Sequence, residues 1–201
     1  MKTTEINVTI TLEEEMLGMQ PADPEIADTF IASNAPNAMS RAEEIEAIGV
    51  EAAQEKGKTI FPKMEDGTPF IWDYQIKGFF KDACGCLSRI KGVTESSKLK
   101  AYKKVIDGLI FVKERKIPII LCENGSIGTC QRPLRAQTMQ GERVALAASE
   151  TVPAQSTITF TIQLLDEKLE PVVIEWLDYG ELRGLGQWRN SGKGKFTYVI
   201  N

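Results

Sequence analysis

Three segments of the chain alternate between polar and apolar residues, and each predicts a β-strand with one buried face. They are residues 5–12, 156–164 and 196–200. Successive side chains of a strand point to opposite faces, so an alternating segment presents its apolar side chains on one side. In the first segment the apolar positions are Ile6, Val8, Ile10 and Leu12.

Other segments repeat their apolar residues at the spacing of a helix. A capping-box pattern at Ser40 to Glu43 predicts a helix that ends near residue 57. Further helices are predicted over the second half of residues 69–83, over residues 94–112 and over about residues 171–180. In the second and third of these helices, the positions expected to face the core are Ile76, Phe79, Phe80, Leu99, Tyr102, Ile106 and Leu109.

Short strands and loops are expected between these elements. Residues 59–62 and 117–122 predict short extended segments, and residues 65–68 carry turn-forming residues. Residues 20–39 predict an irregular insertion, and the polar, basic residues 131–136 predict a loop. Helices and strands are intermixed, with several connections too long for a simple βαβ repeat, which indicates an α+β fold.

The composition is that of a globular chain with an uneven charge. Its 201 residues are 42% hydrophobic and 26% charged. No apolar run approaches the roughly 18 residues that span a bilayer, and the first residues lack an apolar signal region, so we expect a cytoplasmic protein with no membrane contact.

The charge is divided unevenly along the chain. Residues 1–66 hold 5 Lys/Arg and 14 Asp/Glu, a net charge of −9, whereas residues 67–201 hold 19 Lys/Arg and 14 Asp/Glu, a net charge of +5. Only the second part is expected to attract a polyanion.

The chain contains no histidine. This excludes Ser–His and Cys–His nucleophilic sites, histidine-based RNA cleavage and most catalytic zinc sites. Its four cysteines have CxC and Cx7C spacings, which are not the usual zinc pattern. Buried, reduced thiols are therefore favoured over a structural zinc site at Cys84, Cys86, Cys122 and Cys130.

A glycine-rich stretch near residue 190 is the strongest candidate for a binding site. Two Gly-x-Gly pairs bracket a five-residue tip that carries Trp188 and Arg189. Glycine permits a positive φ and close approach to backbone amides, and four nearby cations would add charge, so the stretch predicts a cradle for a phosphate backbone. The alternative is a basic β-hairpin tip, with Trp188 packed on the core. The candidate residues are Arg183, Gly184, Gly186, Trp188, Arg189, Gly192, Lys193, Gly194 and Lys195.

Lysines on two predicted helices are further candidates. Lys77 and Lys81 form a cationic pair at i,i+4 spacing on the helix within residues 69–83. The helix over residues 94–112 presents a lysine face, which is either a solvated surface or a contact for nucleic acid. That face consists of Lys98, Lys100, Lys103 and Lys104.

Three segments, in this order, resemble the RAMP superfamily of CRISPR effector proteins, especially the backbone subunits that coat guide RNA. The first is residues 66–78, similar to the family's Gly-x-Pro-x-Ile-Pro-Gly-Ser-Ser-Leu-Lys-Gly segment. The second is residues 149–154 with the strand over 158–164, similar to a Glu-x-Val-Pro strand. The third is the Gly-x-Gly-x5-Gly-x-Gly motif of residues 184–194. One departure is clear, because Trp72 to Gln75 replace the Pro-Gly-Ser-Ser portion, which puts the backbone contacts made there in doubt.

The resemblance implies a single domain over residues 1–201 with a modified ferredoxin-like (RRM-like) core and a C-terminal glycine-rich loop. Helical and loop insertions are expected at about residues 20–66 and 84–116. It also implies that RNA is bound by the sheet face, the glycine-rich loop and the basic helix, with self-association along the RNA or assembly with other effector subunits. No cofactor is implied.

Non-catalytic binding of RNA or single-stranded nucleic acid is the favoured function, and two alternatives stay open. One is a stand-alone protein, for example a viral one, that acts through protein–protein contacts on a defence complex, using the acidic residues 1–66. The other is a metal-dependent ribonuclease that uses Asp23 or Asp28, although neither lies in a convincing motif. The choice between RNA and single-stranded DNA is also open.

Overall fold

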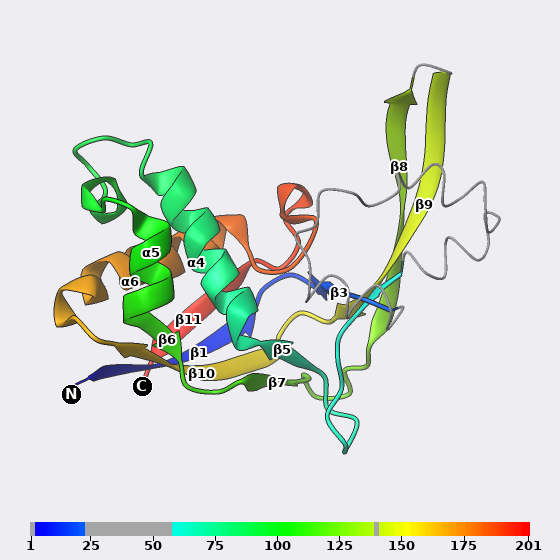
Figure 1. Ribbon diagram of the computed structural model, residues 1–201. Helices are drawn as coiled ribbons and strands as arrows, with labels where there is room; N and C mark the ends of the chain where they lie inside the picture. The colour runs from blue at the N-terminus through cyan, green and yellow to red at the C-terminus, as the bar shows by residue number, and fades with distance from the viewer. Residues whose placement is uncertain (1–2, 23–57, 139–140) are drawn as a thin grey trace.

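The computed structural model describes residues 3–22, 58–138 and 141–201. The predicted helix over residues 40–57 and most of the predicted insertion over residues 20–39 lie outside them. In the described chain, helices lie on one face of a sheet, and a long β-hairpin projects to one side of this body (Figure 1). Helices and strands are mixed along the sequence, so the predicted α+β class is confirmed.

The main sheet is antiparallel throughout, and its centre combines both ends of the chain. Strand β1 pairs with β10 over eight residues and with β11 over five, so the first and last described strands are neighbours. The strand order is β11-β1-β10-β7-β5, and β6 pairs with a different part of β10. The strands are β1 (Thr4–Leu12), β5 (Phe70–Trp72), β6 (Ile110–Val112), β7 (Lys116–Ile120), β10 (Thr157–Leu164) and β11 (Phe196–Ile200).

The helices cover one face of this sheet, and the apolar alternation of the strands decides which face. Ile6, Val8, Ile10 and Leu12 are all nearly or fully buried, as predicted. The core is completed by Trp176, which is fully buried and lies 5.3 Å from the Phe80 ring centroid. The helices are α4 (Asp73–Leu87), α5 (Tyr102–Leu109) and α6 (Glu170–Arg183), with short 3-10 turns η1 (Glu95–Lys98), η2 (Glu167–Leu169) and η3 (Arg189–Ser191).

A second sheet carries the projecting hairpin. Strands β8 and β9 pair over eleven residues from Gly128–Thr151 to Thr138–Gly141, and extend well beyond the body (Figure 1). The base of the hairpin is held by Glu150, whose carboxylate accepts a hydrogen bond from the Phe61 backbone N–H at 3.0 Å. The strands are β2 (Met16–Leu17), β3 (Gln20–Pro21), β4 (Thr59–Ile60), β8 (Gly128–Thr138) and β9 (Gly141–Val152).

Two predictions of local structure were wrong. Residues 131–136 form part of β8 instead of a loop, because their backbone groups pair with β9 in spite of their polar composition. The helix predicted over 94–112 is broken into η1, α5 and β6, because Ala101 adopts a left-handed conformation with φ of 50°. Ile106 is buried as predicted, but Leu109 is 36% exposed.

Two helical glycines give opposite predictions for stability. Gly180 lies inside α6 against the Phe196 ring, which occupies the position that a Cβ atom would need, whereas a Cβ on Gly78 in α4 meets nothing within 4 Å. We expect Gly180→Ala to lower the free energy of unfolding by about 1–3 kcal/mol or more through overpacking. Gly78→Ala should raise it by about 0.5–1 kcal/mol through helix propensity. Urea denaturation measures both, and a destabilising Gly78→Ala would contradict the placement of α4.

Candidate nucleic-acid interface

The glycine-rich stretch forms the connection from α6 to β11 and is not a β-hairpin tip. Helix α6 ends at Arg183, the short turn η3 follows, and β11 begins at Phe196. The two ends of the connection meet, since the Leu185 N–H donates to the Gly194 carbonyl oxygen at 2.8 Å. Leu185 is buried in the core, so the connection is a closed loop with an internal anchor.

All four glycines of the loop have positive φ, as the predicted loop requires, but three of them face protein atoms. A Cβ on Gly184 would lie 2.6 Å from the Lys193 carbonyl oxygen, and one on Gly186 would lie 2.8 Å from Met16 Cγ. A Cβ on Gly194 would overlap the Leu185 carbonyl oxygen. Only at Gly192 is the space open apart from one side-chain atom at 3.9 Å. Three of these glycines are therefore required first of all by packing, because the loop lies close against itself and against β2.

The loop is also fixed to the turn that follows β1. The backbone N–H groups of Glu13 and Glu14 donate to the Lys195 carbonyl oxygen at 2.8 and 3.3 Å. The Gly194 N–H donates to the Glu15 carbonyl oxygen at 2.9 Å. Lys193 Nζ lies 2.6 Å from a Glu15 carboxylate oxygen, and this hydrogen bond raises the pKa of Lys193.

The cations of the loop are largely balanced by carboxylates from elsewhere in the chain. Asp82 on α4 accepts from Arg189 Nη1 at 2.8 Å and lies 3.5 Å from Arg183 Nε. Arg183 Nη1 also donates to the Asn190 side-chain oxygen at 2.5 Å. Among the described residues, Lys195 is the loop cation with no salt bridge. The loop is therefore less electropositive than its sequence indicates.

An open, polar pocket of about 380 Å³ lies at the tip of the loop. Trp188, with φ of 54° and 41% of its surface exposed, forms one wall. The Arg132 guanidinium of β8 lies 5.2 Å from the centroid of the Trp188 ring, and Arg132 Nη2 donates to the Gln187 side-chain oxygen at 3.1 Å. The pocket therefore lies where the loop touches the projecting hairpin. Its lining residues are Arg183, Gly186, Gln187, Trp188, Arg189 and Asn190.

Lys77 and Lys81 lie on a different side of α4 and do not join this pocket. Lys81 pairs with Asp107 of α5 at 2.7 Å, and Lys77 Nζ donates to the Asp107 backbone carbonyl at 3.3 Å. Burial lowers the pKa of Lys77, while the Asp107 carboxylate acts in the opposite direction. In Figure 1, α5 and the loop that follows α6 flank α4 on opposite sides. The predicted site residues thus form two separate groups.

The open face of the main sheet is a network of polar side chains. Thr161 Oγ1 can donate its one proton to the Asn7 side-chain oxygen at 3.0 Å or to a Glu114 carboxylate oxygen at 2.9 Å, and the Thr9 and Thr159 hydroxyls lie 3.1 Å apart. These groups satisfy one another, and Glu114 adds a negative charge. The predicted RNA contact through the sheet face therefore has little support from the side chains on that face.

Two residues that contact the lining of the pocket were missed by the sequence analysis. Arg132 was placed in a loop, and Asp82 was not considered as a partner for the loop arginines. Both lie more than fifty residues from the loop, and their contacts depend on strand pairing and helix packing. No local sequence pattern carries that information.

The other candidate sites are only partly within the described structure. Asp23 and Asp28 lie outside it, as does most of the acidic stretch 1–66. Over residues 3–22, 58–138 and 141–201, no three Cys, Asp or Glu side chains gather as a metal site would require, and no helix is long and apolar enough to cross a membrane. Of the cysteines, Cys84 is buried, and Cys86, Cys122 and Cys130 are partly buried free thiols.

Comparison with known proteins finds similarity of structure. No protein-family model and no curated protein matches the sequence. Among solved structures, a chain of the Type III-B Cmr-beta complex bound to cognate target RNA is similar over 100% of this chain and 60% of its own length, with a TM-score of 0.57 and 13% identity. Cmr6 from Pyrococcus furiosus is similar over 99% of this chain and 100% of its own length, with a TM-score of 0.51 and 10% identity.

These neighbours are RAMP-type CRISPR subunits, so the resemblance drawn from the sequence is confirmed at the level of the fold. The described chain covers only 60% of the length of the first neighbour.

The packing of the loop glycines predicts a contrast between Gly194 and Gly192. Both have positive φ, so an alanine at either position is strained by about 1–2 kcal/mol. Gly194→Ala adds a backbone overlap with Leu185, so we expect a much larger loss of unfolding free energy, or failure to fold. Urea denaturation followed by tryptophan fluorescence compares the two variants. Equal losses at both positions would show that the loop is not closed as described.

Proposed function

We propose that this chain is a RAMP-type subunit of a CRISPR-like ribonucleoprotein assembly, and that it binds RNA or single-stranded nucleic acid without cleaving it. The observation that carries the proposal is the exposed Trp188 ring, held beside the partly buried Arg132 guanidinium at an open pocket, on a fold similar to RAMP-type CRISPR subunits. An aromatic ring beside a guanidinium suits an unpaired base, because any base can stack on it. One of the structural neighbours is a chain of a complex that is bound to cognate target RNA.

The core of the chain is ferredoxin-like in this proposal. The order β1–α4–β6–β10–α6–β11, with the spatial order β11-β1-β10-β6, is that of a split βαβ pair. The loop between α6 and β11 is then the C-terminal glycine-rich loop expected from the family resemblance. Within residues 84–116, η1 and α5 lie between α4 and β6 and would form the proposed insertion, while β6 itself belongs to the core.

The net charge of the loop determines how it would bind nucleic acid. Arg183 and Arg189 share one carboxylate, Asp82, so together they keep a net positive charge that a phosphate can approach. Lys195 adds a further cation at the base of the loop. Each phosphate contacted by such cations releases condensed counterions, so affinity falls as salt rises.

Assembly along the nucleic acid is the second part of the proposal. The hairpin of β8 and β9 extends away from the body (Figure 1) and would present a surface to a neighbouring molecule. A neighbour would be another copy of this chain or another effector subunit. The base of the hairpin carries Arg132, so such a contact would lie next to the pocket.

Trp188→Ala should weaken binding of a labelled 30-nucleotide RNA by about tenfold, since a stacked base contributes ~1–3 kcal/mol. The melting temperature should change little, because the ring is 41% exposed. Trp188→Phe, which keeps an aromatic ring, is the matched control and should retain most of the affinity. Gel shifts across a salt series measure both variants. If Trp188→Ala binds as tightly as the parent protein, the pocket does not hold a base.

A further inference from the structure

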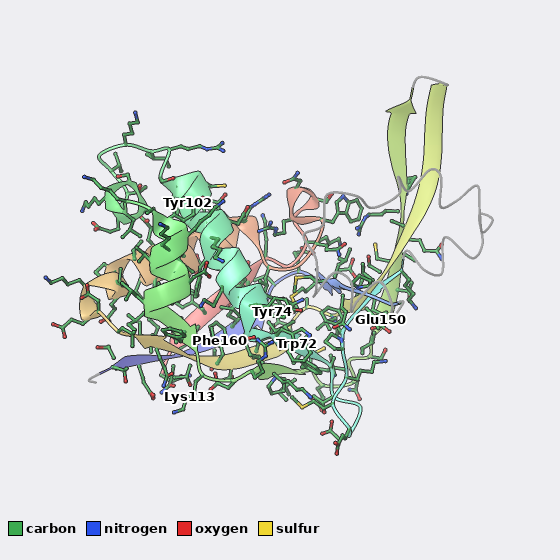
Figure 2. The ribbon with its side chains drawn as sticks, in the orientation of Figure 1. Trp72, Tyr74, Tyr102, Lys113, Glu150 and Phe160 are labelled. Atoms are coloured by element: carbon green, nitrogen blue, oxygen red, sulfur yellow. The ribbon has the colours of Figure 1, made fainter. Side chains whose placement is uncertain are left out.

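A second aromatic cluster lies where β5 ends and α4 begins, away from the glycine-rich loop. Its side chains are Trp72 and Tyr74, which Figure 2 places together at the start of α4, with Arg115 and Lys116 on the adjoining strand segment. We name these four residues the Trp72 cluster. No part of the function proposed above uses it.

Strand pairing and the strand-to-helix transition build this cluster. In the β5–β7 pair, Trp72 lies directly opposite Lys116, so their side chains share one side of the sheet edge. The chain then turns into α4, where the Trp72 backbone N–H donates to the Gln75 side-chain oxygen at 2.9 Å. This turn brings the Tyr74 ring to 6.2 Å from the Trp72 ring, at an interplanar angle of 14°.

Both cations lie over these rings. The Arg115 guanidinium is 5.2 Å from the Trp72 centroid and 5.7 Å from the Tyr74 centroid. Lys116 Nζ is 5.9 Å from the Trp72 centroid and 5.4 Å from the Phe70 centroid. A planar guanidinium held against a ring presents its other face outward, where a nucleobase stacks well.

The cluster is held in place before any ligand arrives. Trp72 Nε1 donates to the Gln20 side-chain oxygen at 3.3 Å, and the Trp72 ring packs edge-on against Phe70 at 4.9 Å. Asp73 pairs with Arg115 and its backbone N–H donates to the Arg115 carbonyl oxygen at 3.2 Å. A fixed platform loses little conformational entropy on binding, which favours affinity.

The cluster is nevertheless accessible. Tyr74 is 43% exposed, and 66% of the Arg115 side chain is exposed. With Asp73 balancing Arg115, Lys116 leaves the cluster with a positive charge among the described residues. Its own cations already occupy positions over the rings, which disfavours a cationic ligand, and charged side chains break up the apolar surface that a protein partner would need.

We infer that the Trp72 cluster is a second stacking site, which holds an unpaired base of the same single-stranded nucleic acid. Aromatic planes flanked by cations are the usual means of holding such bases without reading their sequence. The inference rests on the proposed function. The two sites lie near opposite parts of α4, since Trp72 caps its start and Asp82, ten residues on, contacts the loop, which corresponds to about 15 Å along the helix axis.

Tryptophan fluorescence tests the inference directly, because the chain has three tryptophans and Trp176 is fully buried. In Trp188→Phe, the partly exposed Trp72 is the reporter. In Trp72→Phe, the exposed Trp188 is the reporter. Oligo(rU) and oligo(dT) of about 30 nucleotides are added to each variant. We expect the oligonucleotide to quench the tryptophan fluorescence of both variants. Comparing oligo(rU) with oligo(dT) distinguishes RNA from single-stranded DNA as the source of the base.

Variants of the cluster supply the matched affinity measurements. Tyr74→Ala should weaken oligonucleotide binding several-fold to about tenfold, whereas Tyr74→Phe keeps the ring and should bind normally. Arg115→Ala should weaken binding more than Lys168→Ala, which removes one positive charge from an exposed position on η2. Melting temperatures confirm that each variant is folded.

The possible failures are distinguishable. If the parent protein binds and Trp188 is quenched but Trp72 is not, and Tyr74→Ala binds normally, the inference is wrong while the proposed function stands. If the cluster variants keep their affinity but lose self-association in sedimentation, the cluster is a protein contact and the inference is again wrong. If the parent protein binds neither oligonucleotide, the proposed function fails and the inference with it.

Discussion

The contact between backbone segments at the base of the glycine-rich loop is the constraint on which the candidate site depends. Residues 184–185 and 193–195 pass so close to each other that a side chain at Gly184 or Gly194 has no room. This crossing seats Leu185 in the core and joins the end of α6 to β11, which in turn lies beside β1. The position of Trp188 at the tip follows from it, because the tip cannot move independently of the crossing.

The strands with strict alternation could be predicted from the sequence, since burial of one face is a local property of the pattern. β1 and β10 were found almost residue for residue for that reason. β8 was missed because its order comes from pairing with β9, while its own composition is polar and basic. The break at Ala101 was also hidden, because nothing in an alanine signals a left-handed conformation imposed by the surrounding packing.

The candidate site shows the same division between local and long-range information. Positive φ at the glycines followed from residue type and spacing, whereas the exposure of Trp188 did not, because the sequence left packing of this ring on the core equally open. The charge of the loop was overestimated, because Asp82 and Glu15 come from distant elements and pair with its cations. Lys77 and Lys81 were predicted as a cationic pair from their charge and i,i+4 spacing, whereas helix packing directs them to Asp107. Electrostatics of a site thus depend on partners that only the tertiary structure supplies.

The contact between Arg132 and Trp188 connects the projecting hairpin to the glycine-rich loop, in addition to the contacts that both make with β2. Arg132 belongs to the base of the projecting hairpin, and Trp188 belongs to the wall of the pocket. Any ligand that displaces Trp188 from the guanidinium must therefore alter the free energy of the hairpin's orientation. By thermodynamic linkage, a neighbour that grips the hairpin must alter the affinity of the pocket by the same factor. Under the proposed function, joining the assembly and filling the pocket would in that sense be a single coupled equilibrium.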